Sequence, residues 1–176
     1  MRNKIVIGVM GVLLYAGGLA KADIDLHQDT TIDGGTWPGN TNVYDTAILT
    51  VNGGDIMSIS AFDYSIVNVS GGSIGIIFLT DLENATINLT GGDITGFHGR
   101  FNSPNAINIY GKDFVVWQNG QDAYLSGKWA NNSDFDFYFL RSNGLPDIVS
   151  LHIVPEPLTL SLLALGSSLI LYKRRR

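Results

Sequence analysis

A short unit that recurs five times along the chain is the feature that most constrains its fold. Each unit places alternating apolar and polar residues before a glycine corner, and an apolar residue follows the corner. The first glycines are separated by 19, 18, 20 and 20 residues, and four of the five units carry a Gly-Gly pair. Regular spacing of this length is typical of proteins that stack one structural unit on the next. The units occupy residues 30–37, 49–56, 67–74, 87–94 and 107–114.

The alternation within each unit predicts a strand with one buried face. The glycine pair permits positive φ and a sharp corner, after which the chain returns an apolar side chain to the core. One inward column is predicted to hold Ile32, Val51, Val69, Leu89 and Ile109, and a second Leu49, Val67, Ile87 and Ile107. The returning side chains are Trp37, Ile56, Ile74, Ile94 and Phe114.

One unit cannot bury its own apolar face, but stacked units can. We therefore predict an all-β fold, a short parallel β-helix of about five rungs within residues 23–114. The alternative is an antiparallel β-sandwich in which the glycine pairs mark hairpins, although the near-constant spacing favours the solenoid. From Val115 the repeat fades. Two β-prone stretches, 133–140 and 148–154, predict a β cap over residues 115–154 that covers the open end of the stack.

The first 22 residues have the three parts of a secretory signal peptide. Arg2 and Lys4 supply a short positive region, and residues 5–19 are apolar or small and uncharged. Ala20 and Ala22 then place small side chains at the two positions that a signal peptidase reads. We predict a signal helix over residues 1–22, removed between Ala22 and Asp23. A retained N-terminal membrane anchor is the alternative.

The residues from 155 to 176 also have the composition of a transport signal. Pro155, Glu156 and Pro157 precede an apolar run over 158–172, and the residues 173–176 are Lys-Arg-Arg-Arg. As a helix rising roughly 1.5 Å per residue, this run would extend about 22 Å. A stable transmembrane helix usually needs about 20 residues, so the run would hold the protein in a membrane only provisionally. The terminal cations favour the cytoplasmic side, which predicts that the body lies outside the inner membrane.

In this order, the three parts of the tail are similar to the PEP-CTERM sorting signal. The resemblance is confined to the tail and carries no information on the body. It implies an exopolysaccharide-producing Gram-negative host and cleavage by an exosortase at or near Pro155, Glu156 and Pro157. It also implies release of the body to the cell surface or extracellular matrix. The exosortase and the signal peptidase would be transient partners. An ordinary C-terminal anchor is the alternative reading of the same residues.

Without its two ends, the chain is strongly acidic. The formal charge of the whole sequence is −5, but residues 23–154 contain four cations against 15 carboxylates, a formal charge of −11. Such a surface argues against binding nucleic acid, whose phosphates require a positive surface, and against docking on anionic lipid. The chain has no cysteine, so packing and strand ladders must stabilise an exported domain without disulfides.

Two carboxylate arrangements are candidates for chemistry. Asp134 and Asp136 fall on one face of a predicted strand, where a pair could support glycoside hydrolysis. Strand alternation opposite Phe135, Phe137 and Phe139 explains both as a solvated face. The second arrangement is a column of polar side chains beside the glycine turns, whose oxygens could bind Ca²⁺. Asp and Ser also favour such turns for local reasons, which explains the column more simply. We therefore predict no metal and no cofactor. This column holds Thr36, Asp55, Ser73, Asp93 and Asp113.

Amide and aromatic side chains provide two further patterns. Asn68, Asn88 and Asn108 share an outer column and are expected to hydrogen-bond along the stack, with sugar binding as a second use of their amides. The aromatic residues could form platforms for a ligand, although packing in the core or cap is commoner. These are Tyr110, Trp117, Tyr124 and Trp129, and the histidines at 27, 98 and 152 lack metal-ligand spacing.

Together these patterns predict a non-enzymatic protein of the cell surface or matrix, a structural or adhesive component associated with exopolysaccharide in a biofilm. The alternatives are a polysaccharide-active β-helix enzyme and a carbohydrate- or calcium-binding module. The rungs leave little room for the loops that carry catalytic groups in such enzymes. Catalytic residues are therefore not assigned.

Overall fold

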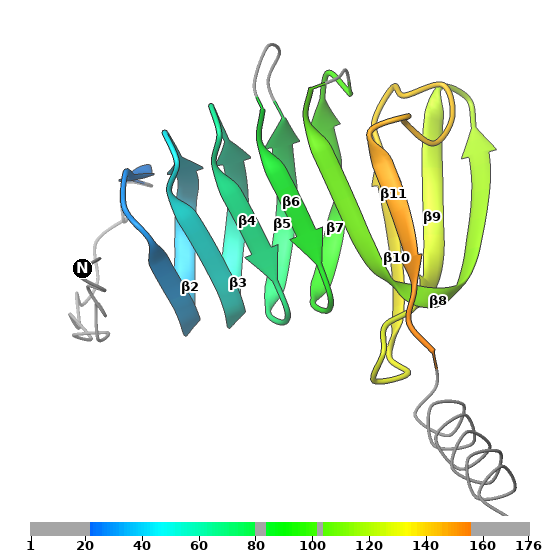
Figure 1. Cartoon of the computed structure of the whole chain (residues 1–176), viewed down its shortest axis with the longest axis horizontal. Coiled ribbons are helices and arrows are strands. Elements are labelled where there is room, and N and C mark those ends of the chain that lie inside the picture. The colour runs from blue at the N-terminus through cyan, green and yellow to red at the C-terminus, as the bar shows by residue number, and fades with distance from the viewer. Residues whose placement is uncertain (1–21, 80–83, 102–103, 156–176) are drawn as a thin grey trace, which may run out of the picture.

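The computed structural model describes residues 22–79, 84–101 and 104–155, and these residues form an all-β fold without a helix (Figure 1). The strands are β1 (Ile24–Leu26), β2 (Thr30–Val43), β3 (Ile48–Ala61), β4 (Ile66–Val69), β5 (Ser73–Leu79), β6 (Thr86–Leu89), β7 (Asp93–Gly99), β8 (Ala106–Asn119), β9 (Asp122–Lys128), β10 (Asp134–Phe139) and β11 (Val149–Ile153).

Equivalent residues of successive repeat units pair with one another in parallel. Val51 pairs with Ile32 on one side and with Val69 on the other, and the same column continues into β6 and β8. The predicted parallel β-helix is therefore confirmed, and the antiparallel sandwich is excluded for the repeat. The regular spacing determines this register because each strand pairs with its counterpart one turn later.

Each turn of the chain contributes to two facing layers of strands. The first face consists of the N-terminal parts of β2, β3 and β8 together with β4, β6 and β11. The second face consists of β1, the C-terminal parts of β2 and β3, then β5, β7, β10, β9 and the C-terminal part of β8. The chain proceeds turn by turn from the N-terminal end of this stack to the cap (Figure 1).

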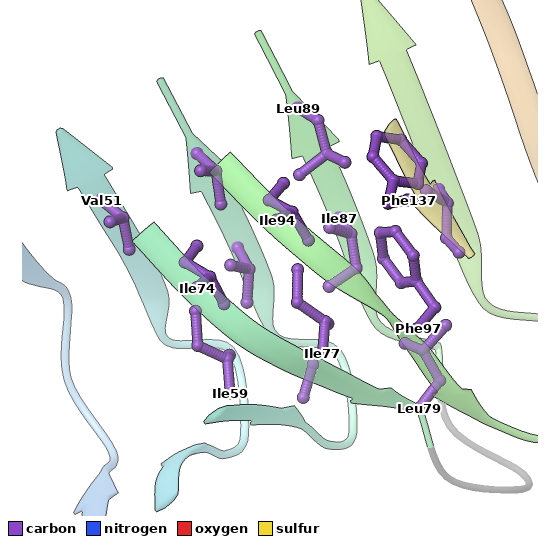
Figure 2. Close-up of a cluster of buried hydrophobic side chains, with 14 of the residues drawn as sticks. Val51, Ile59, Ile74, Ile77, Leu79, Ile87, Leu89, Ile94, Phe97 and Phe137 are labelled. Atoms are coloured by element: carbon purple, nitrogen blue, oxygen red, sulfur yellow. The ribbon is translucent and has the colours of Figure 1, made fainter. Parts of the chain in front are cut away.

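The core lies between the two faces, and the predicted inward columns line it from the first face (Figure 2). Every member of both columns is at most 1 % exposed, as the alternation predicts. Ile56, Ile74 and Ile94 return to the core from the second face and are also buried. Trp37 and Phe114 pack against the core but are only partly buried, because they belong to the outermost repeat units.

The glycine corners allow one rung to approach the next. A Cβ atom on Gly91 would lie 2.3 Å from the carbonyl oxygen of Ser70 in the preceding rung. Gly34 belongs to the first unit, and a Cβ atom there would meet nothing within 4 Å. The second glycine of the pair has positive φ, for example 96° at Gly92, which side chains disfavour. Close approach and turn geometry therefore account for the recurring Gly-Gly pair.

The fifth corner differs from the others. Here Lys112 replaces the second glycine, and the positive φ falls on Asp113 instead. The C-terminal part of β8 does not pair with β7. It pairs antiparallel with β9, which pairs antiparallel with β10, and β10 pairs in parallel with β7 through Tyr138 and Phe139. Two strands of the cap are thus inserted between the fourth and fifth rungs of the second face.

The cap predicted for residues 115–154 therefore extends both faces of the stack. β10 and β9 continue the second face, and β11 continues the first face by pairing in parallel with β8. The predicted boundary after residue 114 falls inside β8. The end of the stack is closed by strands and by the segment between β10 and β11, of which Leu145 packs against the core.

All strand pairings and buried side chains described above lie between Ala22 and Pro155, so this stretch contains its own core. The predicted signal helix and C-terminal transmembrane helix fall on residues 1–21 and 156–176, which lie outside the described residues. Within the described part of the chain, no helix is long and apolar enough to cross a membrane.

Candidate functional site

The predicted asparagine ladder forms on the outer side of the first face. Asn88 Nδ2 donates to Asn68 Oδ1 at 2.9 Å, and Asn108 Nδ2 donates to Asn88 Oδ1 at 2.9 Å. His152 of β11 ends the ladder, with Nε2 3.3 Å from Asn108 Oδ1. The side-chain oxygen and one N–H of Asn88 are therefore already hydrogen-bonded to neighbouring asparagines. This arrangement favours a structural ladder over sugar recognition.

A second ladder, which sequence reasoning did not single out, runs beside the first glycine corners. Asn52 Nδ2 donates to Asp33 Oδ1 at 2.8 Å, and Ser70 Oγ donates to Asn52 Oδ1 at 2.8 Å. The signal was present, since these residues precede the Gly-Gly pair in three consecutive units. Polar ladders thus connect neighbouring rungs on their solvent side, where strand pairing alone would leave the side chains unconnected.

The predicted carboxylate column is only partly formed. Asp55 pairs with Thr36 and Ser73, and Ser73 pairs with Asp93, so four of the five residues align across the second face. Asp113 does not align with this column, because after the fifth corner β8 pairs with β9 and not with β7. No group of three or more possible metal ligands occurs within the described residues.

The insertion of β9 and β10 nevertheless brings Asp93 and Asp113 of the column into one pocket with Asp134 and Asp136. An open pocket of about 540 Å³ lies where β7, β8, β9 and β10 meet. It is lined by Asp93, Asp113, Ser126, Gly127, Lys128, Asp134, Phe135 and Asp136. Residues that are up to 43 positions apart in the sequence, from Asp93 to Asp136, therefore share one acidic surface with a single lysine.

Lys128 is the basic residue among the side chains that line this pocket. Its Nζ lies 2.5 Å from Asp134 Oδ1, across the antiparallel pair of β9 and β10. The hydrogen bond to Asp134, followed by attraction to the charge of that carboxylate, raises the pKa of the Lys128 ammonium above its ordinary value of 10.5. The lysine therefore stays charged at neutral pH and offsets part of the repulsion among the surrounding carboxylates.

Asp134 and Asp136 are both exposed, and their strand buries Phe135, Phe137 and Phe139 on its opposite face. The pair thus matches the solvated face that strand alternation predicts.

A second pocket is lined by two arginines. Two of the four cations of the body, Arg100 and Arg141, line a pocket of about 430 Å³ beside the segment that connects β10 to β11. Asp147 lines the same pocket, and the Arg141 backbone N–H donates to Asp122 Oδ1 at 2.7 Å. Sequence reasoning missed this pocket because the two arginines are 41 positions apart and lie outside the repeat.

The predicted aromatic platforms divide into two groups. Trp129 belongs to the core: it is 2 % exposed, and its Nε1 donates to the carbonyl oxygen of Gly92 at 3.0 Å. Trp117, in contrast, is 44 % exposed and stacks on Tyr124 with ring centroids 4.0 Å apart. Tyr110 stacks on His152 at 4.5 Å, so this aromatic pair ties β11 to β8.

The remaining histidines lie on different parts of the stack. His27 Nδ1 lies 2.8 Å from Asp45 Oδ2 near the N-terminal end of the stack, and His98 lies beside Phe78 on the second face. Of the predicted processing residues, Ala22 and Pro155 are exposed at the two limits of the described chain. Ala20, Glu156 and Pro157 lie outside the described residues.

No protein-family model, curated protein or solved structure matches this chain.

Proposed function

We propose that the protein is an exported, non-enzymatic component of the cell surface or extracellular matrix. In this proposal, a signal peptidase removes residues 1–22 and an exosortase cleaves at or near Pro155. The acidic β-solenoid then acts as a structural or adhesive element associated with exopolysaccharide. The membrane contact through the C-terminal segment is temporary.

The observation that carries the proposal is that the described fold extends to both predicted cleavage positions and uses the residues just inside them. Asp23 already belongs to the fold, since its Oδ1 accepts a hydrogen bond from the Asn40 backbone N–H at 3.0 Å. The Val154 backbone N–H donates to the Gly111 carbonyl oxygen at 2.9 Å, and Pro155 is exposed. Cleavage at both positions would therefore leave every described rung intact.

The chemistry of the surface supports a structural role. Two rows of its polar side chains form ladders between rungs, and the exposed carboxylates of the acidic pocket lack the burial of a general acid. A rigid acidic rod without disulfides suits a hydrated matrix, because net charge favours solubility.

Mass spectrometry of the extracellular protein tests the route. We expect a mature N-terminus at Asp23 and loss of the apolar run over 158–172. Glu156→Ala should block the loss of the C-terminal apolar run. Asp147→Ala, which removes an exposed carboxylate nine positions earlier in the sequence, should not. An extracellular form that still carries residues 158–176 would contradict the proposal.

The pocket of Arg100 and Arg141 favours a second candidate, a module that binds an acidic polysaccharide. Guanidinium groups pair well with carboxylates, and these two lie together on a body of net charge −11. Calorimetry with polygalacturonate tests this: Arg141→Gln should weaken binding, and Lys128→Gln in the other pocket should not. Release of new reducing ends would instead favour an enzyme. If neither binding nor release of reducing ends were detected, both the binding module and the enzyme would be contradicted.

A further inference from the structure

The C-terminal part of β8, residues 115–119, forms an open edge of the second face. β9 pairs with these residues on one side, from Val115 with Ser126 to Asn119 with Asp122. Among the described strands, none pairs with them on the other side. This strand lies at the far end of the stack (Figure 1). A strand in this position presents a row of backbone donors and acceptors that another strand can extend.

The side chains of this edge strand are apolar and exposed on both sides of the sheet. Val115 is 56 % exposed, Val116 46 % and Trp117 44 %. Val115 and Trp117 lie on the outer side with Tyr124, whereas Val116 lies on the inner side with Leu125. No charged residue occurs from 114 to 121, although the body carries a net charge of −11.

The other outer strands of the stack carry features that discourage pairing. β1 has only three residues and contains Asp25. The N-terminal part of β2 lies between Asp29 and Asp33, and β11 is followed by Pro155. Shortness, charge and proline are the usual protections of edge strands. In the edge of β8, by contrast, neither a charged residue nor a proline occurs from 114 to 121.

We propose that this edge pairs with the same strand of a second copy, antiparallel and about a two-fold axis, to form a dimer with a continuous second face. A two-fold axis makes an edge strand its own complement, because each donor then meets the equivalent acceptor of its partner. The strand is also neutral, so two acidic domains can meet there without bringing carboxylates together.

The side chains fit this arrangement. Antiparallel pairing keeps outer residues on the outer side and inner residues on the inner side, so Val115, Val116 and Trp117 meet apolar or amide neighbours from the second copy. With the two-fold axis at Val116, Val116 faces its equivalent on the inner side, and Trp117 of each copy lies opposite Val115 of the other on the outer side. Head-to-tail stacking of copies fits less well, because it would place β1, a three-residue strand that contains Asp25, against the edge of β8.

The inference concerns the folded body and does not depend on the proposed route of export. Sedimentation velocity on residues 23–155, which contain the whole core, tests it at several protein concentrations. We expect a discrete dimer for the unmodified segment and a monomer for Val115→Lys. Ile153→Lys is the matched control, since it places the same charge at an exposed aliphatic residue of the other C-terminal edge, and it should leave the dimer unchanged.

A second measurement does not require a variant that disrupts the edge. The chain has no cysteine, so any disulfide in Val116→Cys joins two copies. With the two-fold axis at Val116, this residue faces its own equivalent in the second copy, and facing residues of an antiparallel pair are close enough for a disulfide. We expect cross-linking of Val116→Cys and none of Ile153→Cys. A body that stays monomeric at all concentrations, or a dimer that persists in Val115→Lys, would overturn the proposal.

Discussion

The second to fourth rungs and the cap use different kinds of contact. Each regular rung repeats the register, the glycine corner and the polar ladder of the rung before it. In the cap, β9 and β10 reach their places through contacts that occur once, such as the bond from Trp129 to the Gly92 carbonyl and the ring stack of Phe97 on Phe139. The comparison shows that a repeat specifies its own continuation, whereas its termination needs individual side chains.

The largest effect is expected where one of these individual contacts joins the cap to a rung. Trp129→Ala removes a buried indole and its hydrogen bond to Gly92, so it should lower the free energy of unfolding by about 3–5 kcal/mol. Trp117→Ala removes an exposed indole and should have a much smaller effect. Urea unfolding followed by circular dichroism measures both. Equal losses in the two variants would contradict the division between core and surface tryptophans.

The next effect separates the first glycine corner from a later one. Gly91→Ala forces a Cβ atom against the backbone of Ser70 and should cost about 1–3 kcal/mol, a typical value for overpacking. Gly34→Ala has open space at the same repeat position and should be nearly neutral. Thermal unfolding of the pair checks the difference. If Gly34→Ala were as damaging as Gly91→Ala, turn geometry rather than stacking would explain the glycine.

A smaller effect is expected within the asparagine ladder. Asn88→Ala removes two side-chain hydrogen bonds, and at about 0.5–1 kcal/mol for each of these half-buried bonds the loss should be near 1–2 kcal/mol. Asn42→Ala, which removes one exposed bond to Asp25 at the N-terminal end, is the control and should cost less. Chemical denaturation distinguishes them. A neutral Asn88→Ala would mean that water replaces the ladder without loss.

The smallest effect concerns the pair of Lys128 and Asp134 in the cap. Because the pKa of Lys128 is raised in the folded state, its contribution to stability is complete at neutral pH and is lost as pH rises through the folded pKa, above 10.5. Nitrogen-detected NMR titration should show a lower Lys128 pKa in Asp134→Asn. Asp136→Asn lies on the same strand face without this hydrogen bond and should change the pKa less.

Much of the regular part of the molecule was predictable from local pattern. Strand alternation identified the buried columns, and equal spacing placed Asn68, Asn88 and Asn108 side by side. The pattern failed at Asp113, which shares the repeat position but not the column. The signal for this departure was Lys112 in place of the second glycine, yet a substituted corner does not indicate where the chain goes next.

The sequence by itself determined the solenoid, its period and its inner and outer sides, because these follow from interactions between equivalent residues of adjacent turns. Only the tertiary structure decided that β9 and β10 enter the second face, that Asp93 and Asp136 line one pocket, and that β8 is left as an open neutral edge. These outcomes depend on pairing between segments that share no repeat. The physical reason is that strand pairing through backbone hydrogen bonds is unspecific in sequence, so packing of side chains such as Phe97, Phe137 and Trp129 selects the partner.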